Sequence, residues 1–303
     1  MFRFICPLIV SSLLLVGLGA SVRASEATQR KIRMEGPARA VHGFPIVLRI
    51  VASGPLEVPR ASVYHHLADI HVNVSHIDGG TTYRFASSAS MSMDMADKEG
   101  HIVADGRRFF NQRLDKNEEM AILVDVFSLD YGRGRFRDVP PGQYTISVTF
   151  PHAKRTSEAK ALELVAPAPV DRAFLDEVVD SKILPRRREI VSWSQVLGES
   201  KTWRVPIDKG QQLPQPAKGQ MQLHLLLYQI QKGEVRSRRL AEAYQVPKYL
   251  ELEKQWVLLK LDRANKVAGA EQALQAFVKT HPEFRWRLRP VYPGSNLFQN
   301  IAD

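Results

Sequence analysis

Cysteine is almost absent from this sequence: Cys6 is the single cysteine among 303 residues, and it lies at the start of an N-terminal apolar run. With no second cysteine, the chain forms no internal disulfide, so a small disulfide-stapled fold is excluded. Cysteine-ligated metals and thiol catalysis beyond the N-terminal run are excluded as well. The chain must rely on a hydrophobic core for its stability.

Long apolar runs are also scarce. One run, residues 5–18, follows Arg3, and the small residues Val22 and Ala24 then precede a cleavage position. We therefore predict a secretory signal peptide over residues 1–24, cleaved after Ala24, and a secreted or periplasmic mature chain; an uncleaved N-terminal anchor is the alternative. No other stretch reaches the roughly 18 apolar residues of a spanning helix, so we expect no transmembrane segment after cleavage.

Charge is distributed unevenly along the chain. Residues 25–166 hold 18 Lys and Arg against 17 Asp and Glu, whereas residues 167–303 hold 22 against 15, an excess of 7 positive charges. The basic character therefore belongs to the second half. Together with the chain length, this asymmetry predicts two domains.

The first half of the chain has the residue pattern of β-strands. Tyr144, Ile146 and Val148 alternate with polar residues after the Pro-Pro-Gly turn at 140–142, which is typical of a half-buried strand. Strands separated by turns, with no helical period between them, favour a β-sandwich. The predicted strands lie within residues 44–52, 69–77, 121–129, 137–151 and 160–167.

The segment "PGQYTISV" (141–148) fits the pattern P-G-x-Y-x-I-x-V. It resembles the late strands of immunoglobulin-like sandwiches in secreted bacterial proteins, and the resemblance covers about residues 39–166. It implies an Ig-like antiparallel β-sandwich, which we place at residues 36–166. That fold carries many unrelated activities, so the resemblance implies little about function.

The second half has a helical period. After a short Pro/Ala linker at residues 167–170, Asp171 is the expected N-cap of the first helix. The last two helices resemble a tetratricopeptide-type hairpin, although no second copy of the unit is in register. The fold class is thus multidomain β + α. We predict helices at residues 171–184, 219–233, 236–245, 249–264 and 269–282, within a C-terminal α-helical domain at 171–290 and before an irregular tail at 291–303.

Methionine and histidine crowd into the first half. Thioether sulfur prefers Cu(I) and imidazole suits Cu(II), and the cluster resembles the Met-x-Met and His combinations of exported copper carriers. The alternative is a set of core methionines on one face of a strand, with no cofactor. The candidate copper ligands are Met91, Met93, Met95 and His101, with His65, His66 and His71 as the second choice.

Basic residues gather in the second half, where they predict contact with a polyanion or another partner. For an exported protein, that partner would be a protein or an acidic envelope polymer rather than nucleic acid. The alternative is a solvated helical face. The three groups are Arg186, Arg187 and Arg188; Arg236, Arg238 and Arg239; and Arg285, Trp286 and Arg287.

Enzyme motifs are scarce. The sequence contains no H-E-x-x-H, G-x-S-x-G, P-loop or G-x-G-x-x-G, and "SEAK" (157–160) fits S-x-x-K only by its letters. We assign no catalytic residue and predict a non-catalytic binding or scaffold protein of the cell envelope. A periplasmic copper-binding protein is the alternative, and an envelope enzyme of unknown chemistry is the second alternative.

Overall fold

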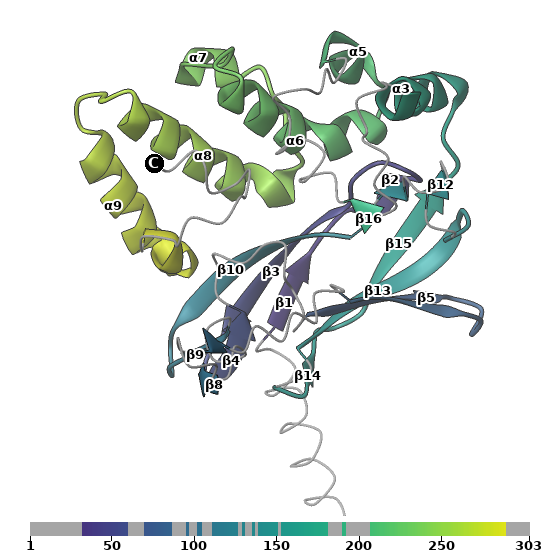
Figure 1. Cartoon of the computed structure of the whole chain (residues 1–303), viewed down its shortest axis with the longest axis horizontal. Coiled ribbons are helices and arrows are strands. Elements are labelled where there is room, and N and C mark those ends of the chain that lie inside the picture. The colour runs from purple at the N-terminus through teal and green to yellow at the C-terminus, as the bar shows by residue number, and fades with distance from the viewer. Residues whose placement is uncertain are drawn as a thin grey trace, which may run out of the picture.

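The chain is a β + α protein, with sheets in the first half and helices in the second (Figure 1). The predicted signal peptide and tail lie outside the residues described. No helix in the described part is long and apolar enough to cross a membrane. The computed structural model describes residues 32–59, 70–86, 95–96, 102–104, 111–126, 129–130, 135–136, 139–150, 153–180, 190–191 and 207–288.

Two sheets contain most of the described strands. The first has the order β1-β3-β10 and is antiparallel; its strands are Ile32–Glu35, Val47–Ser53 and Glu119–Asp125. The second has the order β2-β15-β13-β5-β6; its strands are Arg39–Val41, Lys160–Val165, Gly142–Phe150, His71–His76 and Thr82–Ala86. In this second sheet β2 runs parallel to β15, and the other neighbours along that order are antiparallel.

Several short strands complete the described β-structure. β14 (Arg155–Thr156) pairs with the end of β13. β4 (Leu56–Pro59) pairs with β9 (Asn111–Leu114), and β7 (Met95–Ala96) pairs with β8 (Ile102–Ala104). β11 (Leu129–Asp130) lies between β12 (Arg135–Phe136) and β16 (Ile190–Val191).

The two main sheets face each other across one hydrophobic core. The alternation predicted for β13 is confirmed: every second side chain from Tyr144 to Phe150 is buried, and those between are partly exposed. Ile50 of β3 and Ile122 of β10 join Val148 of β13 in the same buried cluster. The period of 2 along each strand therefore places the apolar side chains between the sheets.

Five helices were predicted, whereas the described residues contain six α-helices; the one at Ile207–Gln212 was not predicted. Those predicted at 219–233, 249–264 and 269–282 correspond to α6, to η1 with α8, and to α9. The described helices are α3 (Pro169–Asp180), α5 (Ile207–Gln212), α6 (Ala217–Gln231), α7 (Arg238–Ala241), α8 (Glu251–Ala264) and α9 (Ala270–Thr280), with the 3₁₀ helices η1 (Lys248–Leu250) and η2 (Pro282–Leu288).

Two predicted helix ends are wrong. Asp171 is not the N-cap: α3 begins at Pro169, and the Asp171 carboxylate accepts a hydrogen bond from the Ala168 N–H at 3.0 Å, within the first turn. The helix predicted at 236–245 is only the short α7. After α7 the chain turns: the Tyr244 N–H donates to the Ala241 carbonyl at 3.2 Å, the Tyr244 side chain enters the helical core, and the Lys254 ammonium binds the Tyr244 carbonyl.

The helices cover the outer face of the three-stranded sheet (Figure 1). β3, which lies within the strand predicted at 44–52, is buried on both faces. Its Leu48 and Ile50 face the second sheet, whereas Val47 joins the helical core together with Leu123 of β10. The helical layer therefore shares a hydrophobic core with the three-stranded sheet. This core contains residues from both of the predicted domains.

Hydrogen bonds tie the helical layer to the segment between β2 and β3. The buried Gln220 of α6 accepts from the Val41 N–H at 2.7 Å and donates to the carbonyls of Val41 at 3.3 Å and Pro45 at 3.2 Å. The hydroxyl of Tyr249 in η1 donates to the Val47 carbonyl at 3.1 Å. These bonds satisfy backbone groups that the helices would otherwise bury without partners.

A glycine is required where β3 leads into β4. A Cβ at Gly54 would lie 2.0 Å from the Asp115 carbonyl oxygen, so a backbone segment would have to move. We expect Gly54→Ala to lower the free energy of unfolding by about 1–3 kcal/mol, measured by urea denaturation. Gly80→Ala is the control, because its Cβ would meet nothing closer than His76 at 3.8 Å. Equal effects of the two substitutions would contradict this explanation.

Candidate functional site

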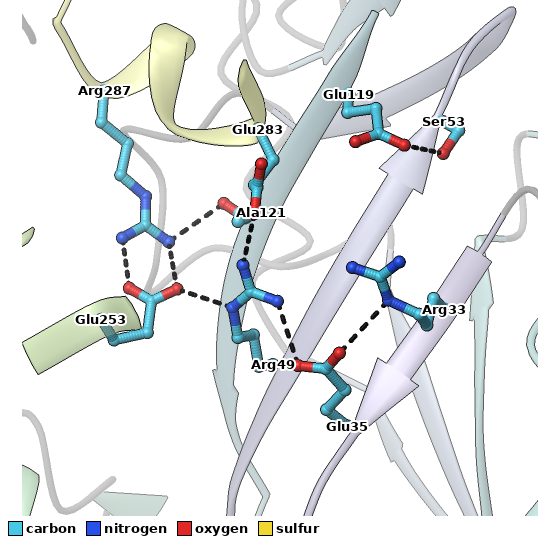
Figure 2. Close-up of polar contacts among 9 residues, drawn as sticks. All are labelled: Arg33, Glu35, Arg49, Ser53, Glu119, Ala121, Glu253, Glu283 and Arg287. Carbon is cyan, nitrogen blue, oxygen red and sulfur yellow. Dashed lines mark hydrogen bonds and ion pairs between the residues drawn. The ribbon is translucent and has the colours of Figure 1, made fainter. Parts of the chain in front are cut away.

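A network of charged side chains lies between the three-stranded sheet and the C-terminal helices (Figure 2). Its centre is the guanidinium of Arg49 on β3, whose side chain is 1% exposed. Arg49 Nη1 lies 3.0 Å from Glu35 Oε2, and Nη2 lies 2.9 Å from Glu283 Oε1. Arg49 Nε lies 3.3 Å from Glu253 Oε1. One cation thus joins carboxylates of β1, α8 and η2.

Arg287 of η2 extends the network to the edge of the sheet. Its guanidinium pairs with Glu253, so that the Glu253 carboxylate bridges two arginines. Arg287 Nη2 also donates to the Ala121 carbonyl of β10 at 3.1 Å. A carbonyl on an edge strand is thereby covered by a side chain, which protects that edge from pairing with another strand.

Local structure explains why these charges meet. β3 alternates, so Arg49 points away from the sheet core while Leu48 and Ile50 point into it. Glu253 lies in the first turn of α8, where the helix dipole stabilises a carboxylate. Glu283 lies in the first turn of η2, the element that packs along β10.

A buried aromatic ring lies beside the ion pairs. Phe284 is fully buried, and its ring centroid lies 5.7 Å from the Arg49 guanidinium and 4.7 Å from that of Arg287. Trp256 of α8 and Phe277 of α9 pack on the same ring, with centroids 5.5 and 5.0 Å away. The ring therefore adds cation–π attraction and excludes water from the charges.

The network is suited to holding two layers together. Glu253 and Glu283 are 2% and 8% exposed, and each pairs with at least one guanidinium that offsets its desolvation. Glu35 is more open, at 27%, and also pairs with Arg33 at 3.2 Å. The arrangement fixes the orientation of α8 and η2 on the sheet.

Comparison with known proteins adds little. The chain matches no family model and no curated protein. Among solved structures it is similar to the sulfur carrier protein SoxY from Chlorobium limicola f thiosulfatophilum, at 8% identity and a TM-score of 0.18, over 50% of this chain and 98% of that chain. A similarity this weak carries no argument about fold or function.

The predicted basic groups have different surroundings. Arg236, Arg238 and Arg239 are all exposed at α7, and Arg238 Nη2 lies 2.8 Å from Asp262 Oδ2. In the third group only Arg285 is exposed. Trp286 is half-buried and packs against the core between the sheets, and Arg287 belongs to the network around Glu253. Arg186, Arg187 and Arg188 lie outside the described residues.

The candidate copper ligands are described only in part. His71 begins β5 and is half-buried, and Met95 begins β7, whose backbone pairs with Ala104 of β8. Within the described ranges, no group of three His, Cys, Asp or Glu could hold a metal ion. The copper hypothesis stays a prediction, and Cu(I) titration of the full chain with methionines replaced by leucine would test it. Met91, Met93, His101, His65 and His66 lie outside the described residues.

Sequence reasoning missed the buried network. One signal was present: Arg49 is the single charged residue within the apolar run 44–52, and a charge in a buried strand needs a partner. Its partners could not be read from the sequence, because Glu253 and Glu283 lie more than 200 positions away and look like ordinary helix-surface residues.

Proposed function

We propose that this protein is a non-catalytic binding or scaffold protein of the cell envelope, in which an Ig-like β-sandwich supports an α-helical domain. The observation that carries this proposal is the buried network. Its carboxylates, Glu253 and Glu283, pair with Arg49 and Arg287 and join the helices to the sheet. A rigid helical layer is what a scaffold needs to present its outer surface to a partner.

Strand order supports the Ig-like part of the proposal. In immunoglobulin-like folds, strands A, B and E share one sheet and strands G, F and C share the other. The orders β1-β3-β10 and β15-β13-β5 agree with this arrangement when β1, β3, β5, β10, β13 and β15 are taken as strands A, B, C, E, F and G. Two sheets packed over one core are also what such a sandwich requires.

A tyrosine at the start of β13 supports the same fold. The Tyr144 hydroxyl donates to the Pro140 carbonyl at 2.6 Å, the bond expected of a tyrosine corner at the start of strand F. Burial, and to a smaller extent the neighbouring Tyr83, raise the pKa of the Tyr144 hydroxyl above its ordinary value. The hydroxyl therefore keeps the proton that it donates at neutral pH.

The proposal also includes export from the cytoplasm and a partner that carries negative charge. The N-terminal sequence supports cleavage after Ala24 and release outside the cytoplasm. The exposed arginines of α7 support a partner with negative charge, either a protein or an acidic polymer of the envelope. The helical layer presents this surface on the side away from the sheets (Figure 1).

Photo-crosslinking of the full chain in its own cells tests the proposal. A photoreactive residue replaces the exposed Arg239 on α7 or, as a control, the exposed Lys116 in the turn between β9 and β10. We expect adducts with an envelope component at position 239 and none at position 116. A chain retained in the cytoplasm, or one without adducts at position 239, would contradict the proposed function.

A further inference from the structure

Two exposed stretches of the helical layer form one surface, here named the basic end. They are residues 236–240, around α7, and residues 263–269, in the turn between α8 and α9, and every residue in both is exposed. The Asn265 side chain donates to the Arg236 carbonyl at 2.7 Å, which joins the two stretches. Figure 1 shows α7 and the α8–α9 turn on the side of the helical layer away from the sheets.

The basic end contains five cations and no carboxylate. Two of the cations are neutralised from its border: Arg238 pairs with Asp262 at 2.8 Å, and Arg263 pairs with Glu271 at 2.9 Å. The other three have no carboxylate partner among the described residues, and one of them, Arg236, instead donates to the Gly233 carbonyl. The basic end thus has three uncompensated positive charges. They are carried by Arg236, Arg239 and Lys266.

Each stretch of the basic end also exposes a large apolar side chain. Leu240 and Val267 are each 50% exposed. Such side chains beside cations suit the headgroup region of a bilayer, where the apolar groups enter and the cations contact phosphates. Binding to a soluble polyanion would leave the side chains of Leu240 and Val267 exposed to water. Protein contacts are enriched in aromatic anchors, and the basic end contains none.

We propose that the basic end docks this protein on the surface of a bilayer that contains anionic phospholipids. This inference rests on the proposed function, since an envelope protein works beside such a bilayer. Docking is peripheral: Arg236, Arg239 and Lys266 attract the anionic surface, and Leu240 and Val267 enter it. Because exposed charges supply the attraction, salt weakens the binding.

Vesicle sedimentation with the purified full chain tests the inference. The vesicles contain phosphatidylcholine alone or phosphatidylcholine and phosphatidylglycerol at about seven to three. We expect binding to the anionic vesicles only, and loss of that binding at about 1 M salt, where the screening length is about 3 Å. Absence of binding to anionic vesicles at low salt would overturn the inference.

Charge variants locate the contact. The triple variant Arg236→Gln, Arg239→Gln and Lys266→Gln should bind anionic vesicles about 100-fold more weakly, since each cation contributes about fivefold near such a surface. The matched control removes three exposed cations from the first half of the chain and should bind within about threefold of the unchanged chain. Equal losses in both variants would overturn the inference. The control substitutions are Arg113→Gln, Lys116→Gln and Lys160→Gln.

Apolar variants separate a bilayer from a soluble polyanion. Leu240→Ser with Val267→Ser should weaken vesicle binding about tenfold and leave binding to soluble polyphosphate unchanged. Unchanged vesicle binding in this double variant would mean that electrostatic attraction alone holds the protein on the vesicles. That result would overturn the proposal that the basic end enters a lipid bilayer. Protein or polymer adducts at position 239 without vesicle binding would remove the inference and leave the proposed function standing. Because docking also places position 239 against an envelope component, absence of adducts there would contradict both proposals. A chain that binds vesicles but is retained in the cytoplasm would contradict only the proposed function.

Discussion

Arg49→Met should lower the free energy of unfolding by about 3–5 kcal/mol, as measured by urea denaturation of the full chain. The substitution keeps an unbranched, flexible side chain at the site but removes the charge. Glu283, which is 8% exposed, would lose its guanidinium partner, and Glu253, at 2%, would keep only Arg287. A carboxylate buried without its partner accounts for most of the expected cost.

Two control variants distinguish buried pairing from a general effect of removing arginine. Arg39→Met breaks the pair with Glu163, whose side chains are 60% and 39% exposed, and should cost at most about 1 kcal/mol. Adding Glu283→Leu to Arg49→Met should recover part of the loss, because Glu283 no longer brings an unpaired charge into the interface. A loss from Arg49→Met no larger than that from Arg39→Met would mean that water reaches the network.

The sheets could be predicted from the sequence because their signal is local. Alternation from Tyr144 to Phe150 is a property of neighbouring residues, and the apolar run at 44–52 marks a strand covered on both faces. What covers the second face was not predicted. That cover comes from α6, α8 and η2, through contacts whose partners are distant in the sequence, such as Pro45 with Gln220.

In the helical layer, the hydrophobic periodicity of the sequence does not predict where every helix ends. Residues 236–245 have helix-forming composition, yet α7 stops at Ala241. Tyr244 is buried in the helical core, and Lys254 of α8 binds the carbonyls of Glu242 and Tyr244. Tertiary contacts of this kind override the helix propensity of the segment, and no local pattern indicates them. The exposed cations of α7 were predicted, but their neighbours in the α8–α9 turn were not, since only the fold brings the two together.

Phe284→Ala should lower the free energy of unfolding by about 3–5 kcal/mol, again by urea denaturation. The ring is fully buried against Trp256 and Phe277, so its removal leaves a cavity in the layer between α8, α9 and η2. The ring also lies beside the guanidinium groups of Arg49 and Arg287. Loss of the ring therefore weakens both the apolar contact and the exclusion of water from the ion pairs.

A double-mutant cycle separates these two contributions. If Phe284 excludes water from the network, Phe284→Ala and Arg49→Met are coupled, and their costs differ from additivity by about 0.5–3 kcal/mol. Phe284→Leu is the matched control, because it keeps an apolar side chain in the site and should cost less than Phe284→Ala. Additive costs would show that the aromatic cluster and the ion pairs stabilise the interface independently. The coupling energy between Phe284 and Arg49 thus measures whether the aromatic cluster and the ion pairs form a single interface without water, which orients the helical layer on the sheet.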